Sequence, residues 1–265
     1  MSELDYVPAR VPDDCTLRIS PSSFANFIER PWNWYRTTVL GLDKFEYNTA
    51  SVLGTVVHYC AEKYAKGLDV NEKEISKYIA KHKVKEDYFP EEVATNWRSM
   101  AIALVNGYVA HNKDNYLYTE EQVCASLKDG AYVAGTVDVV EGTKEDAVLT
   151  DYKTYSSKTK PKSIPKNYYY QLLTYAYILR EQGVNVQRVR LVYVNRNIEG
   201  ELSQKTGKKL KSYPPEVTVL TQVITDEDIN YIKSMLDLCK ETVQVTKSNP
   251  ELAHVIWHDP RLKNI

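Results

Sequence analysis

Residues 131–155 read AYVAGTVDVVEGTKEDAVLTDYKTY and decide the fold. Their two apolar runs have the β-branched and aromatic content of strands, and the polar residues 142–146 between them predict a turn. Just upstream, YLYTEEQVCASL (116–127) has the same character, and the pair Asp129-Gly130 is a hairpin signal. The sequence therefore predicts three consecutive strands that form a meander.

The residues before this meander predict mostly helix. Ser20-Pro21 is a favoured helix start, because serine caps the first turn and proline fits its first position. Apolar residues recur at helical spacing over 49–66, and two further helices are predicted over 71–83 and 91–112.

Helices and strands alternate after the meander. A helix is predicted over 167–182 and a buried strand over 188–196. A further strand over 216–224 leads into a final helix that runs from Thr225 to about residue 247. This order predicts an α/β fold, with helices packed on both sides of a mixed central sheet.

The length of 265 residues fits a single domain. We expect a mainly helical N-terminal part (1–115), a core that carries the site (116–195), and a C-terminal strand and helix (196–265). The structural role of the last part is not indicated by any motif.

Composition excludes several classes of protein. No apolar run approaches the roughly 18 residues of a membrane span, so no membrane association is expected. The four cysteines are scattered without a C-x-x-C pair, which argues against a zinc site and against a disulfide framework. A cytoplasmic location is the simplest expectation. The net charge of −1 does not identify a partner.

Lysines concentrate in two short segments. Either segment is equally well explained as a solvated loop or as a basic rim beside an acidic cleft. The lysines are Lys158, Lys160, Lys162 and Lys166, followed by Lys205, Lys208, Lys209 and Lys211.

Two carboxylates and a lysine stand inside the predicted meander. Asp138 and Asp151 each lie in an apolar strand, where a carboxylate is costly unless a partner compensates it. Alternation along a strand places Asp151 and Lys153 on one face, and pairing across the turn brings Asp138 close to them. A divalent cation, one ion or two, relieves the repulsion, and oxygen ligands suit Mg²⁺ or Mn²⁺. Lys153 could then position an attacking water and neutralise charge during phosphodiester hydrolysis.

Residues on the neighbouring helices support this interpretation. His58 could supply a third metal ligand, and Glu62, one turn later, could orient it. Gln171 and Tyr175 are four residues apart and share a helical face. As alternatives, His58 and Tyr175 could be residues of the hydrophobic core, and Glu62 could be a charge that faces solvent.

Five motifs in a fixed order carry a family resemblance. Together they resemble the PD-(D/E)XK nuclease superfamily, in particular its RecB-like branch, which includes CRISPR-adaptation nucleases and phage recombination exonucleases. The resemblance runs from about residue 18 to residue 195. The motifs are RISPSSFANFIERPWNWY (18–35), GTVVH (54–58), GTVDVV (135–140), TDYKT (150–154) and QLLTY (171–175).

The resemblance implies a restriction-endonuclease-like fold and a set of site residues. His58, Asp138, Asp151 and the Tyr152 carbonyl would be metal ligands, and Lys153 would be the catalytic lysine. The helix residues Gln171 and Tyr175 would support the site. Glu121, on the strand before Asp138, would match a further acidic position of the branch.

The resemblance also implies an activity. We expect a DNA exonuclease that leaves 5′-phosphate ends in recombination, repair or processing and acts on single strands or duplex ends. A bacterial or phage origin would place it in the bacterial cytoplasm, with a protein partner in a recombination or CRISPR-type complex. The helical N-terminal part is expected to arch over a single strand, with Arg30, Trp32, Trp34 and Arg36 contacting it.

The departures from the family pattern concern cysteine. Many members carry a cysteine before the proline of the first motif and three more near the C-terminus, which hold an iron–sulfur cluster. Arg30 occupies that first position, and the C-terminal region offers only Cys239. No iron–sulfur cluster is expected.

The sequence also allows two other classes of function. A nuclease-derived module could bind DNA or a protein without cutting, but every catalytic position here carries a competent side chain. A purely structural protein, suggested by 21 tyrosines and four tryptophans, would leave the carboxylates in the apolar strands unexplained.

Overall fold

The predicted mixed sheet forms the centre of the molecule. The computed structural model describes residues 11–42, 46–82, 87–155, 160–196, 203, 205–209 and 211–257. Across these residues the sheet has six strands in the order β1-β3-β4-β5-β6, with β2 also paired to β3. The strands are β1 (Leu17–Ile19), β2 (Tyr116–Ser126), β3 (Ala131–Gly142), β4 (Ala147–Tyr155), β5 (Val186–Asn195) and β6 (Val217–Val223).

Strands β2, β3 and β4 form the expected antiparallel meander. Strand β1 runs parallel to β3, β5 runs parallel to β4, and β6 returns antiparallel to β5. The α/β fold class predicted from the sequence is therefore confirmed, with a mixed sheet flanked by helices.

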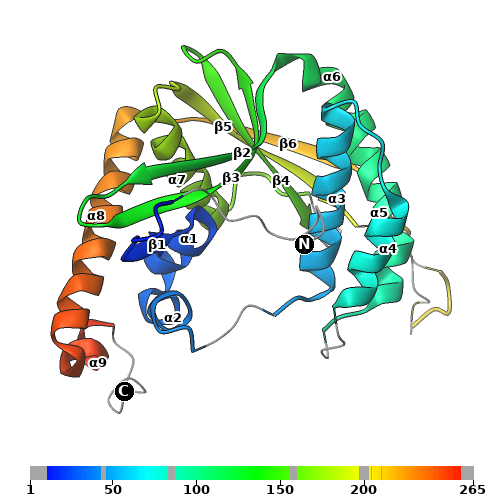
Figure 1. Cartoon of the computed structure of the whole chain (residues 1–265). Helices are drawn as coiled ribbons and strands as arrows, with labels where there is room; N and C mark the ends of the chain where they lie inside the picture. The colour runs from blue at the N-terminus through cyan, green and yellow to red at the C-terminus, as the bar shows by residue number, and fades with distance from the viewer. Residues whose placement is uncertain are drawn as a thin grey trace.

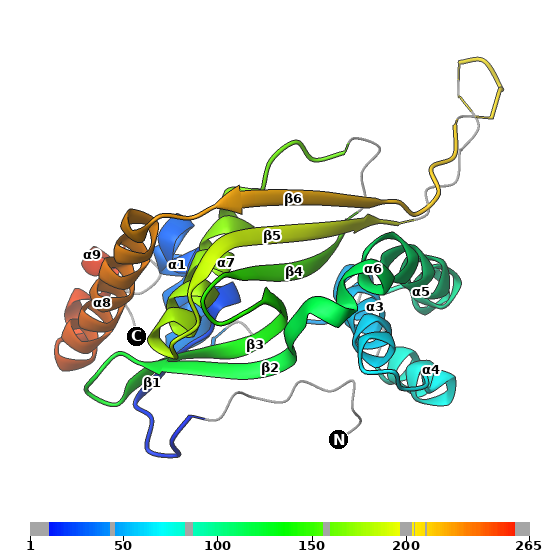
Figure 2. The same ribbon diagram turned by 90° about the horizontal axis from the view of Figure 1, so that it is seen from above.

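Two helical layers bury the two faces of the sheet (Figures 1 and 2). The first layer contains α1 (Pro21–Glu29), α2 (Pro31–Trp34), α7 (Lys166–Glu181), α8 (Asp226–Ser248) and α9 (Ala253–Ile256). The second contains α3 (Thr49–Ala65), α4 (Glu72–Lys81), α5 (Pro90–Leu104) and α6 (Ala110–Asn112). The short turns are η1 (Tyr35–Val39), η2 (Val105–Val109), η3 (Lys113–Asn115) and η4 (Pro250–Leu252).

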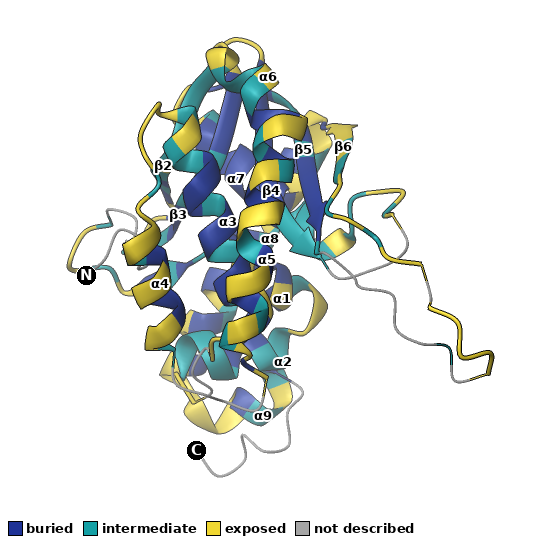
Figure 3. Cartoon of the chain, turned by 90° about the vertical axis from the view of Figure 1, so that its right-hand side faces the viewer, coloured by how far each residue is buried: buried dark blue, intermediate teal, exposed yellow. Residues whose placement is uncertain are grey.

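Local sequence explains where these helices begin. The Ser20 hydroxyl accepts a hydrogen bond from the Ser23 amide, and Pro21 occupies the first turn of α1. Helix α4 buries Ile75, Tyr78 and Ile79, while its other residues face solvent (Figure 3). None of the helices in the described part of the chain has the length and apolarity to cross a bilayer.

Two features were not predicted. Strand β1 lies inside the part expected to be helical. The tail, which gave no clear assignment, forms η4 and α9 and buries the Trp257 ring among Phe27, Trp34 and Tyr35. Burial of this large aromatic surface anchors the chain after α8 to the first helical layer.

Strand β3 changes its neighbour along one edge, and this change positions the site. Residues 131–133 pair with β1, whereas residues 139–142 pair with β4. Asp138 lies where β4 diverges from β3, and its carboxylate accepts a hydrogen bond of 2.7 Å from the Tyr152 amide of β4. The sheet is therefore forked at Asp138, and a side chain bridges the two strands where backbone pairing ends.

Candidate active site

Asp151 and Lys153 share one face of β4 at the fork. The Lys153 Nζ lies 2.5 Å from Asp151 Oδ2. Between them, the Tyr152 ring points to the opposite face and packs in the second helical layer, where its hydroxyl lies 3.0 Å from that of Tyr116. The alternation predicted from the sequence is confirmed.

Helix α7 supports this pair from its own side of the sheet. Gln171 Nε2 donates a hydrogen bond of 3.1 Å to Asp151 Oδ1, so both carboxylate oxygens are engaged. The Tyr168 ring lies 5.4 Å from the Lys153 ammonium, which favours the charged amine. Tyr175 lies one helical turn after Gln171, and its hydroxyl packs closely on β3. A Cβ atom added at Gly135 would lie 2.6 Å from that hydroxyl. Gln171 thus supports the carboxylate, while Tyr175 packs against the strand that carries Asp138.

His58, Glu120 and Asp138 form a second cluster beside β3, the other strand of the fork. Each offers one ligand atom, and these atoms lie within 4.8 Å of one another. His58 reaches the cluster from α3, with its Nδ1 3.4 Å from Asp138 Oδ1, and its ring meets the Tyr152 ring edge-to-face at 5.8 Å. Ligands of one Mg²⁺ or Mn²⁺ ion stand about 3 to 4 Å apart, since each bond is about 2.1 Å. Two carboxylates and an imidazole at this spacing fit such an ion.

Glu120, and not the neighbouring Glu121, belongs to this cluster, and the role predicted for Glu121 stays a prediction. In β2, Thr119 faces Val139 and Glu121 faces Val137, which leaves Glu120 opposite Asp138. Glu120 also has a positive φ of 51°, and Glu121 is exposed. Because neighbouring strand residues point to opposite faces, the site can receive only one of the two glutamates.

Burial and mutual charge shape the electrostatics of the site. Burial, and then the Asp138 carboxylate, raise the pKa of Glu120 well above its ordinary value. Burial likewise raises the pKa of Asp151 to about 6, with Asp138 adding to the effect and Lys153 opposing it. Both raised pKa values show that it is unfavourable for these carboxylates to be ionised together in one buried site.

The two basic groups respond in the opposite direction. Burial disfavours the imidazolium, yet the neighbouring Asp138 carboxylate raises the pKa of His58 to about 9. Burial also opposes the Lys153 ammonium, but Asp151 and Asp138 more than offset it and raise the pKa of that lysine. Three carboxylates thus face two cationic side chains, and a divalent cation can take the place of the proton that the raised pKa of Glu120 favours.

Trp34 does not lie at the site, and its expected contact with DNA is excluded. Its ring is fully buried and packs edge-to-face on Phe27 at 5.3 Å, with the Trp257 ring 6.1 Å away. A ring enclosed by apolar neighbours cannot stack on a base. The prediction failed because the partner Trp257 came from a tail with no assigned structure.

The remaining predicted residues lie around the fork or away from it. Glu62 follows His58 by one turn of α3 and pairs with Lys66 at 2.6 Å. Arg30 is exposed at the end of α1, and Arg36 is half-buried in η1. Their expected contacts with a DNA strand stay predictions.

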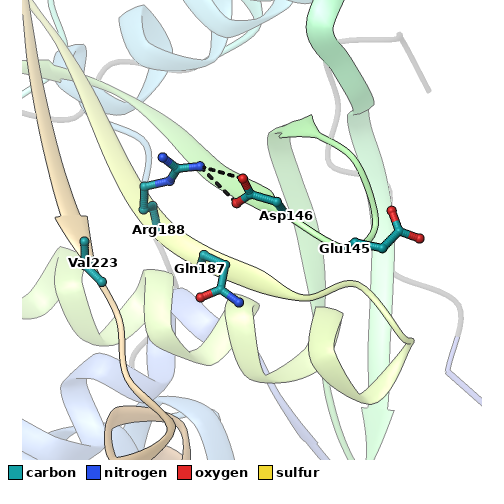
Figure 4. A pocket seen from close by; sticks show the side chains of 5 residues that line it. All are labelled: Glu145, Asp146, Gln187, Arg188 and Val223. Carbon is teal, nitrogen blue, oxygen red and sulfur yellow. Dashed lines mark hydrogen bonds and ion pairs between the residues drawn. The ribbon is translucent and has the colours of Figure 1, made fainter.

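A pocket lies at the opposite edge of the sheet from Lys153. It is a shallow, open depression of about 420 Å³ next to the Arg188–Asp146 ion pair, whose atoms are 2.9 Å apart (Figure 4). Asp146 precedes β4 and Arg188 lies near the start of β5, whereas Lys153 lies near the end of β4. The pocket is therefore separate from the carboxylate cluster.

Comparison with solved structures gives distant likenesses. A candidate exonuclease from Eubacterium rectale is 14% identical, with a TM-score of 0.48, and the match covers 91% of this chain and 81% of that one. An alkaline exonuclease from Laribacter hongkongensis is 12% identical, with a TM-score of 0.32, and the match covers 72% of this chain and 91% of that one. Among curated proteins, no relative matches this chain.

A family model matches most of the sequence. It is the model of the PD-(D/E)XK nuclease superfamily, and the match spans residues 18–246. This span contains the forked sheet and each residue of the two clusters described above. The chain belongs to the PD-(D/E)XK nuclease superfamily.

Proposed function

We propose that this nuclease hydrolyses phosphodiester bonds of DNA and depends on Mg²⁺ or Mn²⁺. The observation that carries the proposal is the juxtaposition at the fork. The Lys153–Asp151 pair, 2.5 Å apart, stands next to the His58–Glu120–Asp138 cluster, whose ligand atoms lie within 4.8 Å of one another. This arrangement combines an anionic cation site with a positive charge for phosphate.

The metal would be held by His58, Glu120 and Asp138. Bound there, a divalent ion would polarise the scissile phosphate and lower the pKa of a water molecule. Asp151 is adjacent, but its oxygens are engaged by Lys153 and Gln171. A role of Asp151 and of the Tyr152 carbonyl as further ligands belongs to this proposal, since movement of Lys153 toward substrate would release one Asp151 oxygen.

The protein's own groups would bind and orient the phosphate. The Lys153 ammonium stays charged because Asp151 and Asp138 raise its pKa against the effect of burial. It can therefore neutralise negative charge that grows on the phosphate oxygens. Water attacks phosphorus, the bond to the 3′ oxygen breaks, and the products are a 5′-phosphate and a 3′-hydroxyl. Gln171 keeps Asp151 in place for this step.

We further propose that the enzyme acts from DNA ends in recombination, repair or processing. Support comes from the resemblance of the five motifs to the RecB-like branch, in which end-processing enzymes predominate. A protein partner in a recombination or CRISPR-type complex is part of the same proposal.

The test is digestion of end-labelled single- and double-stranded DNA with Mg²⁺, Mn²⁺ or EDTA. Wild type should release products with 5′-phosphates in either metal but not in EDTA, and should leave covalently closed circles intact. Asp151→Asn should reduce the rate at least about a thousandfold. Glu121→Gln is the matched control and should retain activity, because Glu121 is exposed beside the site. Unchanged cleavage by Asp151→Asn would refute the proposal, and cleavage of closed circles would refute action from ends.

A further inference from the structure

The two lysine-rich segments begin at the edge of the sheet that carries Lys153. Strands β4 and β5 are parallel, and their last paired residues are Tyr155 and Asn195. Lys153 pairs with Tyr193, two residues earlier on each strand. The chain therefore leaves β4 and β5 from neighbouring positions, two residues beyond the proposed catalytic lysine on β4.

Hydrogen bonds close the base of the second segment, and one ion pair links it to the first. The buried Asn195 side chain donates to the Pro214 carbonyl at 2.9 Å and accepts from the Glu216 amide at 2.5 Å. The Lys160 ammonium lies 2.7 Å from the Glu216 carboxylate. Asn195, Pro214 and Glu216 are thus tied together at the base of the second segment, and Lys160 places the start of the first segment beside it.

Positive charge is concentrated along this edge. In the described parts of the two segments, Glu216 is the one acidic residue, and it already pairs with Lys160. The sequence also places Glu199 and Glu201 between β5 and β6, where basic residues outnumber acidic ones by five to three. The chain as a whole has a net charge of −1, so the excess of lysine is local. We call this surface the lysine edge; its exposed members are Lys160, Lys162, Lys166, Lys205, Lys208, Lys209 and Lys211. Lys158 lies outside the described residues.

The far lysines project away from the body of the molecule. The Ser203 amide donates to the Lys208 carbonyl at 2.9 Å, and the Gly207 amide donates to the Ser203 carbonyl at 2.8 Å, so a turn is closed here. Figure 2 shows this turn beyond the ends of β5 and β6. The chain from Asn195 to Ser203 can span at most about 28 Å, a length that corresponds to about eight nucleotides of one DNA strand.

We propose that the lysine edge binds the phosphodiester backbone of the DNA substrate on one side of the bond held at Lys153. The inference rests on the proposed nuclease function and adds where the rest of the substrate lies. The carboxylates at the fork repel DNA, so attraction must come from a neighbouring basic surface. Lysine ammonium groups are point charges on flexible stems, which suits contacts to phosphates without reading of base sequence.

The experiment measures binding apart from cleavage. The variant replaces Lys205, Lys208, Lys209 and Lys211 by Gln, and the matched control replaces four exposed lysines elsewhere, namely Lys73, Lys77, Lys144 and Lys233. Fluorescence anisotropy with a labelled 30-base-pair duplex, in EDTA and at several KCl concentrations, gives Kd and its dependence on salt.

The lysine-edge variant should bind at least about tenfold more weakly at 0.1 M KCl, and its log–log salt slope should flatten by about two to four, since each phosphate contact contributes about 0.9. The control variant should keep the wild-type slope. The proposal is overturned if the lysine-edge variant matches wild type, or if the control loses as much affinity.

A cleavage assay separates this inference from the proposed function. With Mn²⁺, the lysine-edge variant should lose kcat/KM on the 30-base-pair duplex but not on a four-nucleotide strand, whose three linking phosphates cannot occupy the catalytic site and four lysines together. Equal losses on both substrates would count against the lysine edge and leave the nuclease proposal standing. If wild type cuts neither substrate, the nuclease proposal fails, while the binding measurement still decides whether the lysine edge holds DNA.

Discussion

Strand β3 carries two carboxylates, Asp138 and Glu141, three residues apart in very different surroundings. Glu141 is buried in a closed network: Arg190 Nη1 lies 2.7 Å from its Oε2, Thr150 Oγ1 donates to its Oε1 at 2.7 Å, and the Tyr108 hydroxyl also donates to it. One anion meets one cation and two hydroxyls. Protein groups alone satisfy this carboxylate, and its role is to tie η2 to strands β3, β4 and β5.

Asp138 lies in an open cluster instead. It faces Glu120 and Asp151, while His58 and Lys153 supply the positive charge. Burial opposes ionisation of Asp138, but His58 and then Lys153 hold its pKa below the ordinary value. The comparison shows that burial of a carboxylate does not by itself indicate function. A set of carboxylates that outnumbers its cationic partners does, because a bound proton or metal cation must balance the remaining charge.

The largest expected effect comes from the open cluster. Asp138→Asn should lower the cleavage rate at least about a thousandfold, because it removes a proposed metal ligand. Thermal stability in EDTA should fall only modestly, because the amide oxygen can still accept from Tyr152 although the attraction of Asp138 to His58 and Lys153 is lost. Steady-state cleavage and a melting curve on the same preparation measure both. A variant that unfolds would place Asp138 with Glu141 among structural carboxylates.

The closed network should show the reverse result. Arg190→Met leaves Glu141 buried without its cation and should lower the free energy of unfolding by about 3 kcal/mol. Cleavage per folded molecule should stay near that of wild type at low temperature. Urea denaturation measures the stability. Arg188→Met is the control on the same strand: its pair with Asp146 is largely exposed, so a loss below about 1 kcal/mol is expected. Equal losses in the two variants would contradict the contrast.

The smallest effect distinguishes two adjacent glutamates. Glu120→Gln should weaken Mn²⁺ binding by about tenfold, because Glu120 faces Asp138 and His58. Glu121→Gln should leave the Mn²⁺ affinity unchanged. Isothermal titration calorimetry gives both dissociation constants. Weaker binding in Glu121→Gln alone would restore the original assignment and require a different register of β2.

Much of the fold could be predicted from the sequence because its signals are local. The strands β2, β3 and β4 alternate or run apolar between clear turn signals, and α1 and α8 begin at capping residues that the structure confirms. Strand alternation predicted that Asp151 and Lys153 share a face, whereas their assignment to a site also needed the motifs around them.

The rest depended on information that local patterns do not carry. The register of β2 on β3 distinguishes Glu120 from Glu121, and counting outward from the turn at Asp129 would have given it: Glu120 and Asp138 are each nine residues away. The burial of Trp34 depends on Trp257, more than two hundred residues later, which no periodicity indicates.

The pairing of β1 with β3 has a consequence for how the enzyme is made. Residues 17–19 can pair with β3 only after residues 131–133 have been synthesised. The site also requires α7 in addition to both strands of the fork. Contacts so distant in sequence slow folding. A ribosome-bound or prematurely ended chain that stops before Gln171 contains both clustered aspartates but lacks the helix that holds one of them. Incomplete chains are therefore expected to have little nuclease activity, so the activity appears late in synthesis.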